Sequence, residues 1–142
     1  MSPRRWLPTV LRARQAQEDL LIQQVAAARR DAELAAGQLA ERESRVAGLS
    51  LPGNATVAEF HAKVADQQAA LASLAAATNR VQFADARLAG QLSELTEAAK
   101  SRRTVEKMHE RIQNTLAAQV LSVAQREQDD VTIARHVGRA AG

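Results

Sequence analysis

The chain has 142 residues and a formal net charge of +3, and hydrophobic residues make up 46% of it although aromatic residues make up only 2%. Alanine, which has the best helix propensity but buries little area, occupies 31 positions, so a thick core would be hard to fill. Acidic and basic residues are interleaved along the chain, whereas a nucleic-acid-binding protein gathers one sign of charge on one face. We therefore expect thin helix–helix packing and no nucleic-acid partner.

The sequence contains no cysteine, which excludes disulfides and thiolate metal ligands. It also lacks an apolar run near the ~18 residues of a transmembrane helix, and it lacks the hydrophobic segment of a signal peptide. These features predict a soluble protein that stays in the cytoplasm.

The first predicted helix covers about residues 8–48. Pro8 and Thr9 fit a helix start, because proline is tolerated in the first turn of a helix. Gly48 fits the other end, because glycine readily takes the left-handed conformation that follows the last helical turn.

A short loop is predicted at residues 49–55, with a Pro-Gly-Asn turn at residues 52–54. Thr56 and Glu59 follow as a capping box, in which the Thr56 hydroxyl accepts a backbone N–H bond and the Glu59 side chain reaches back. This pair marks the start of a second helix, about residues 56–137.

Steps of three and four residues along both helices land mostly on apolar side chains. In the first helix nine of these twelve positions are apolar: Val10, Arg14, Glu18, Leu21, Val25, Ala28, Ala32, Ala35, Leu39, Arg42, Val46 and Leu49. In the second helix nine of these twelve are apolar: Val57, Phe60, Val64, Gln67, Leu71, Leu74, Thr78, Val81, Asp85, Leu88, Leu92 and Leu95. Such heptad stripes make helices supercoil against a partner.

A short turn forces neighbouring helices to run antiparallel. We therefore expect a hairpin in which Leu49 meets Val57 and Val10 meets Leu95. The equal lengths of the two stripes favour this hairpin over a parallel homodimer. The prediction is one all-α domain over residues 1–142, an antiparallel coiled-coil hairpin whose second helix is longer than the first.

Beyond Leu95 the same register gives a poor stripe, and a shifted register recovers one through Val105 and Ile112, which predicts a stutter. If the second helix is unbroken at Thr78-Asn79 and Gly90, about 40 residues (~60 Å) extend past the first helix. A bent-back segment or a second copy could cover this stripe, but we favour a docking surface for another protein. The candidate partner-binding residues are Trp6, Arg102, Arg103, Val105, Met108, Arg111, Ile112, Leu116 and Val123.

No set of residues suggests catalysis. Glu106 and His109 have the spacing of one ligand pair of a di-iron bundle, but such sites need a second pair and two further carboxylates. The six glycines are scattered, so no phosphate-binding loop is formed. A two-helix protein also encloses no pocket that would desolvate a nucleophile. We expect a binding protein without catalytic residues, metal or cofactor.

Three segments resemble the flagellar FliJ family. The first is residues 7–21, Leu-Pro-Thr-Val-Leu-Arg-Ala-Arg-Gln-Ala-Gln-Glu-Asp-Leu-Leu. The second is residues 103–111, Arg-Thr-Val-Glu-Lys-Met-His-Glu-Arg, and the third is residues 126–135, which contain the acidic pair Asp129-Asp130. The resemblance covers nearly the whole chain, although the family often has Asp-Glu where this chain has Asp129-Asp130.

The resemblance implies a component of the flagellar type III export apparatus. Proteins of that family are similar to the central stalk of rotary ATPases. They bind the hexameric export ATPase, promote its activity, and contact the cytoplasmic domain of the export gate and the chaperones of export substrates. The implied location is the cytoplasmic face of the inner membrane, reached through partners only.

Four other functions remain open from the sequence. The stalk protein of a virulence-type secretion system would have the same architecture, as would a generic coiled-coil scaffold. A membrane-remodelling scaffold should show a one-sided basic face, which Glu18, Asp19, Asp31 and Glu33 interrupt in the first helix. A nucleoid-type binding module is disfavoured by the balanced charge.

Overall fold

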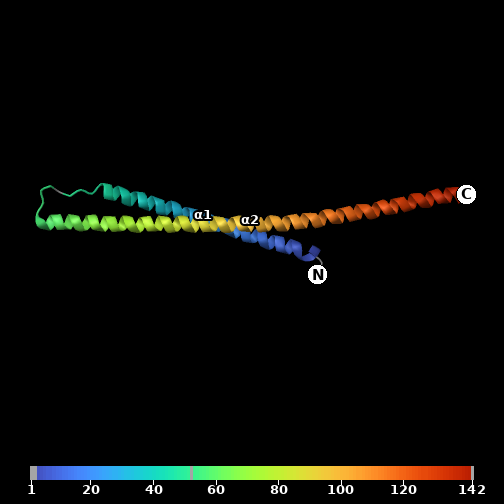
Figure 1. Ribbon diagram of the computed structural model, residues 1–142, viewed down its shortest axis with the longest axis horizontal. Coiled ribbons are helices and arrows are strands. Elements are labelled where there is room, and N and C mark those ends of the chain that lie inside the picture. Colours follow the sequence, from blue (N-terminus) through green and yellow to red (C-terminus); the bar gives the residue numbers. More distant parts are fainter. Residues whose placement is uncertain (1–2, 52, 142) are drawn as a thin grey trace. The chain divides into compact units, whose positions relative to one another are not determined.

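A computed structural model of the chain describes residues 3–51 and 53–141, which contain two helices packed against each other (Figure 1). Helix α1 is Pro3–Ala47 and helix α2 is Val57–Ala141. The prediction of an all-α hairpin with a longer second helix is confirmed.

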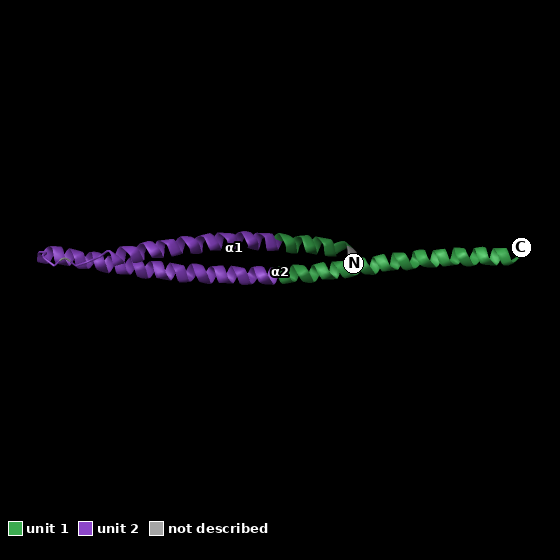
Figure 2. Cartoon of the chain, turned by 90° about the horizontal axis from the view of Figure 1, so that it is seen from above, with its two compact units in different colours: residues 1–16, 99–142 green, residues 17–98 purple. Residues whose placement is uncertain are grey.

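The described residues form two compact units (Figure 2). The central unit is residues 17–98, which contribute most of α1 and the first half of α2. The terminal unit combines residues 3–16 of α1 with residues 99–141 of α2. Each unit therefore contains packed segments that are far apart in the sequence.

Helix α1 begins five residues before the predicted start, so Pro8 lies inside it. Proline has no N–H and therefore leaves one carbonyl of the preceding turn without its helical bond, but its fixed φ is compatible with a helix. Leu7, next to it, is only 1% exposed. Burial of this side chain favours the two turns around Pro8 and offsets the missing bond.

The other end of α1 also differs from the prediction. Gly48 N–H donates to the Ser44 carbonyl at 3.1 Å, and Leu49 N–H donates to the Val46 carbonyl at 3.1 Å. Among the described residues no glycine has a positive φ, so the expected left-handed conformation of Gly48 is wrong. The helix ends instead by tightening from an i−4 to an i−3 bond, which satisfies a terminal carbonyl without left-handed backbone.

The start of α2 confirms the predicted capping box. Glu59 N–H donates to Thr56 Oγ1 at 3.2 Å, and Thr56 N–H donates to Glu59 Oε2 at 3.3 Å. Gly53 and Asn54 form a bend in the segment before it, while Pro52 of the predicted turn lies outside the described residues. Two N–H groups that have no helical partner are thus satisfied by side chains.

Helix α2 continues without a break through Thr78, Asn79 and Gly90. The Thr78 hydroxyl donates to the Leu74 carbonyl at 3.0 Å, so its polar group is satisfied within the helix. A Cβ added at Gly90 would meet nothing within 4 Å, so this glycine marks no close approach of another segment.

The central unit is held together by a seam of small residues. On α1 the predicted stripe is confirmed, because Leu21, Val25, Ala28, Ala32 and Ala35 are buried. On α2 the buried positions are Ala70, Ala77, Ala84 and Ala98. Ala32, Ala35 and Ala84 form one cluster, with Val81 and Leu88 packed against it.

The α2 stripe was predicted one residue too late at four positions. Leu71 is 47% exposed, and Asp85 and Leu92 are also exposed, whereas Ala70 and Ala84, the residues just before Leu71 and Asp85, are buried. Alanine at the contact allows two helix axes to approach closely. Close approach brings backbone and Cβ atoms into contact, and the larger residues then lie along the flanks of the seam.

The pairing of the two helices is also displaced from the predicted register. Arg87 Nη1 lies 3.8 Å from Asp31 Oδ2, whereas the predicted pairs placed Arg87 opposite Glu18 or Asp19, thirteen or twelve residues earlier. The expected contact of Leu49 with Val57 is wrong, because Val57 is 75% exposed. Val10 belongs to the terminal unit and Leu95 to the central unit, so their expected contact stays a prediction.

This register leaves the first turns of α2 uncovered. All residues from 57 to 63 are exposed, and the first buried residue of α2 is Ala70. The segment between the helices therefore does not act as the tight turn that fixed the predicted pairing.

Candidate partner-binding surface

The terminal unit contains every candidate partner-binding residue of the sequence analysis. Trp6 lies on its α1 segment and the other eight lie on its α2 segment, between residues 102 and 123. The structure thus brings Trp6 into the same compact unit as residues that are about a hundred positions away in the sequence.

A regular stripe crosses the first part of α2 in this unit. Its half-buried members follow at steps of three and four residues: Arg102, Val105, His109, Ile112 and Leu116. The same steps lead back from Arg102 to Ala98, the last buried alanine of the central unit. The stripe therefore keeps one heptad register, and the predicted stutter is wrong. The apparent stutter came from the one-residue error in the predicted α2 stripe.

Val105, Ile112 and Leu116 are covered in part by their own unit. Leu7 is almost fully buried, which the side chains of its own helix end cannot achieve. The α2 segment of the terminal unit therefore covers Leu7, and the half-buried stripe is the surface available for this packing. The uncovered part of α2, predicted to begin after Leu95, begins after Leu116.

The polar residues around this stripe make local contacts. Arg102 Nη1 donates to Glu106 Oε1 at 2.7 Å, with side-chain exposures of 22% and 40%. The Gln113 side-chain nitrogen lies 3.0 Å from His109 Nε2. Glu106 and His109, the spaced pair considered as metal ligands, thus each have a protein partner of their own.

Besides Val123, four of the candidate residues in the terminal unit have exposed side chains. Trp6 and Met108 are exposed apolar residues, and Arg103 and Arg111 are exposed basic residues. An aromatic side chain and arginines are the residue types that contribute most to protein–protein contacts. The terminal unit therefore exposes residue types that are common at protein–protein contacts.

The last part of α2 is exposed on all sides. Every described residue from 117 to 141 is exposed, and the larger apolar ones are Val120, Leu121, Val123, Val131, Ile133 and Val137. The predicted stripe ended at Val123, and the apolar residues after it were not predicted. They share no single helical face, because Leu121 and Ile133 lie on other sides of the helix than Val120 and Val131.

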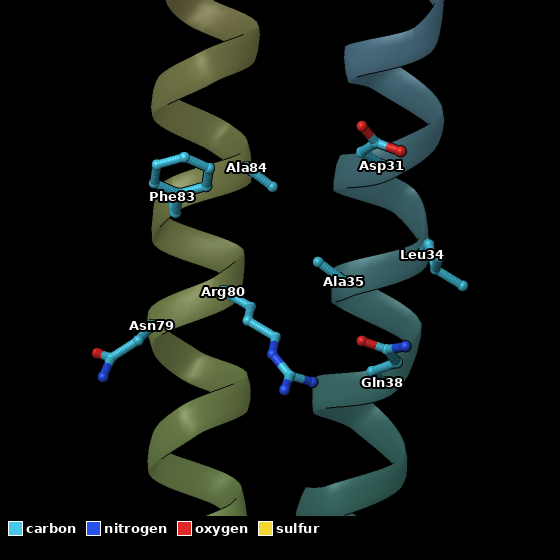
Figure 3. A pocket seen from close by; sticks show the side chains of 8 residues that line it. All are labelled: Asp31, Leu34, Ala35, Gln38, Asn79, Arg80, Phe83 and Ala84. Atoms are coloured by element: carbon cyan, nitrogen blue, oxygen red, sulfur yellow. The ribbon is translucent and has the colours of Figure 1, made fainter.

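A second surface feature lies in the central unit. An open hollow of about 430 Å³ is lined by residues of both helices: Asp31, Leu34, Ala35, Gln38, Asn79, Arg80, Phe83 and Ala84. Phe83 is 72% exposed, and in Figure 3 Arg80 extends from α2 towards α1 while Leu34 points away from α2. The thin alanine seam explains the hollow, because small side chains leave the flanks of the contact unfilled.

No protein-family model, curated protein or solved structure matches the chain. Within residues 3–51 and 53–141, no helix has a stretch that is both long and apolar enough to span a bilayer. The same residues contain no group of three or more histidine or acidic side chains arranged to hold a metal ion.

Proposed function

We propose that the protein is a non-enzymatic stalk component of the flagellar type III export apparatus, which binds the hexameric export ATPase and stimulates it. The observation that carries this proposal concerns the three segments that resemble the FliJ family. Residues 103–111 and 126–135 belong to the terminal unit, and so do residues 7–16 of the first segment. Segments from opposite ends of the sequence therefore contribute to one compact unit.

The exposed side chains of that unit suit a contact that must form and release. Arg103 and Arg111 are exposed charges, which act mainly on the rate and specificity of association. Trp6 and Met108 add exposed apolar area of the kind that anchors an interface. In this proposal the terminal unit contacts the ATPase ring, and the coupling to the export gate and to substrate chaperones uses other exposed faces of α1 and α2.

The experiment measures the ATP hydrolysis rate of the cognate hexameric export ATPase with increasing amounts of the full chain. We expect the chain alone to hydrolyse no ATP and to raise the rate of the ATPase. Replacing Arg103 and Arg111 with glutamate should reduce this stimulation several-fold, because like charges at an interface are strongly disfavoured.

A matched control reverses the same number of charges in the central unit. Arg29 and Arg30 are exposed on α1, and their replacement with glutamate should leave the stimulation within about twofold of the unmodified chain. No change of rate at any ratio of chain to ATPase would refute the proposed function. Equal losses in both double variants would instead show that the terminal unit is not the contact.

A further inference from the structure

The hollow of the central unit combines a shallow floor with exposed apolar side chains. Its floor is the alanine seam, at Ala35 and Ala84. The large apolar residues of its lining are Leu34 and Phe83, which are 63% and 72% exposed. The hairpin itself therefore leaves both uncovered, and a large apolar side chain placed in the hollow would gain contacts with all four residues.

The charges on this side of the hairpin are not balanced. We define the hollow flank as positions 31, 34, 38, 41 and 45 of α1 with positions 73, 76, 80, 83 and 87 of α2, which follow one side of each helix at steps of three and four residues. It contains three arginines and two carboxylates. Arg87 Nη1 lies 3.8 Å from Asp31 Oδ2, and Arg45 Nη2 lies 4.0 Å from Glu41 Oε1. Arg80, the third arginine, has no hydrogen bond or ion pair among the described residues.

The unpaired guanidinium belongs to the hollow. Arg80 extends from α2 towards α1 in Figure 3, and the uncharged Gln38 lines the hollow opposite it. Phe83 is one turn further along α2 than Arg80. A molecule that packs on Phe83 is therefore within reach of Arg80, and a carboxylate on it could form the paired hydrogen bonds that arginine makes with a carboxylate. The hollow thus favours an occupant that is apolar and carries one negative charge.

The openness of the hollow decides which class of molecule fits. A small ligand needs a pocket that buries most of its surface, whereas this hollow leaves Phe83 largely exposed. Nucleic acids and membranes bind clusters of basic residues, whereas the hollow flank has a single unpaired arginine. A helix of another protein meets both conditions, because it inserts one side chain while its own chain holds the rest outside.

A second copy of this chain packed through the same flank fits less well. Both carboxylates of the hollow flank already have an arginine partner. A two-fold axis along the hairpin places Arg80 opposite Gln38 of the second copy, which is neutral. The next carboxylate along this side of α2 is Glu94, and Arg87 is midway between Glu94 and Arg80. An antiparallel pair that brings Glu94 to Arg80 therefore places Arg87 opposite Arg87, where like charges repel.

We propose that the hollow flank binds a helix of another protein that presents a large apolar side chain and, one turn away, a carboxylate. The apolar side chain enters the hollow against Leu34 and Phe83, and the carboxylate pairs with Arg80. One ion pair beside one apolar anchor selects both the partner and its orientation. The surface lies in the central unit, so it is separate from the proposed ATPase contact and does not depend on it.

The test uses the full chain and two synthetic helical peptides, each about four turns long with a leucine at the centre. Four positions after this leucine, one peptide has glutamate and the other has lysine. A nuclear magnetic resonance titration gives the Kd of each up to the millimolar range and follows the Nε–Hε signal of Arg80. We expect the glutamate peptide to bind roughly tenfold or more tightly and to shift this signal, because one contact is complementary and the other repulsive.

Two pairs of variants locate the contact. Arg80→Glu should invert the preference, so that the lysine peptide binds more tightly. Arg29→Glu is its matched control and should leave the preference unchanged, because Arg29 follows the buried Ala28 and lies on the other side of the seam. Phe83→Ala should weaken both peptides several-fold. Leu71→Ala, at an exposed leucine on the other side of α2, should weaken neither.

Several outcomes overturn the proposal. Equal affinity for the two peptides, binding of neither, or a preference that survives Arg80→Glu each shows that this arginine selects no partner helix. Equal weakening by Phe83→Ala and Leu71→Ala shows that the peptides do not bind in the hollow. Circular dichroism should show the same helix content in all four variants, since all four positions are exposed.

Sedimentation equilibrium of the chain alone tests the second copy as the occupant. We expect Phe83→Asp to leave the molecular mass unchanged. A dimer that this substitution dissociates would assign the hollow to self-association and refute the partner helix.

Discussion

Replacing Ala84 with leucine should destabilise the central unit. Ala84 is 9% exposed and lies in the cluster with Ala32 and Ala35, where small residues of the two helices meet. Leucine adds three carbon atoms at this contact. Either the new side chain takes a strained rotamer, or the helices separate locally and the neighbouring alanines lose their contacts. We expect a loss of about 1–3 kcal/mol in the free energy of unfolding.

The neighbouring substitution Asp85→Leu is the matched control. Asp85 is exposed and lies on the flank of the seam, although the sequence pattern predicts it at the contact. With the observed packing, leucine at this position should change stability by less than about 0.5 kcal/mol. With the predicted stripe, the same substitution would replace a carboxylate in the seam by an apolar residue and stabilise the protein. The two positions therefore report which face of α2 is buried.

Urea unfolding followed by far-ultraviolet circular dichroism measures both changes. A lower midpoint with an unchanged slope for Ala84→Leu means that stability has fallen, whereas a changed slope means that the surface exposed on unfolding has changed. Two results would refute the reasoning: an Ala84→Leu variant at least as stable as the unmodified chain, or an Asp85→Leu variant more stable by over about 1 kcal/mol.

Five further substitutions test other parts of the structure by the same unfolding measurement. Gly37→Ala and Gly90→Ala should each add about 0.5–1 kcal/mol, because both lie inside helices with open space around the new Cβ; a loss at either would contradict that open space. Thr56→Ala should cost about 0.5–2 kcal/mol by removing the cap of α2, and no change would mean that the cap is not formed in solution. Ile112→Asp should cost about 1–3 kcal/mol and Val123→Asp less than about 0.5 kcal/mol, and equal losses would show that residues after Leu116 are packed as well.

The fold class and the α1 face were predictable because they depend on local signals. The capping box at Thr56 and Glu59 is a short-range pattern, and the structure contains both of its hydrogen bonds. The α1 stripe was also correct, since large and small apolar residues lie on it together: Leu21 and Val25 are buried with Ala28. Where large and small apolar residues follow the same heptad positions, periodicity identifies the buried face.

The α2 face was missed because its large and small apolar residues disagree. Leu71 and Leu92 suggest one face, whereas Ala70, Ala77 and Ala84 suggest the face one residue earlier, and the structure buries the alanines. Hydrophobicity per residue favours leucine, but close packing of two helices favours the smaller side chain. A stripe of alanines at heptad spacing is therefore a better predictor of a thin two-helix contact than the larger residues beside it.

The register could not be derived from periodicity. Sliding one helix past the other by whole heptads keeps the same faces together. The observed pairing is displaced by twelve or thirteen residues from the predicted one. The predicted register depended on a tight turn at residues 49–55, and the exposed start of α2 at residues 57–63 shows that this turn is not tight. Only a contact between the helices, such as Asp31 with Arg87, fixes the register.

The kind of polar residue on this face of α2, neutral or charged, differs between the covered and the exposed parts of the face. Inside the central unit the stripe contains Gln91, a neutral amide whose Oε1 is buried without a hydrogen-bond partner. A buried amide oxygen of this kind costs about 1–3 kcal/mol, which a packed helix pair can tolerate once. Glu127 lies on the continuation of the same face, where an ionised carboxylate would be far more costly if it were covered without a cation. Glu127 is exposed, so its carboxylate keeps its hydration, whereas the packed part of the face in the central unit carries a neutral amide.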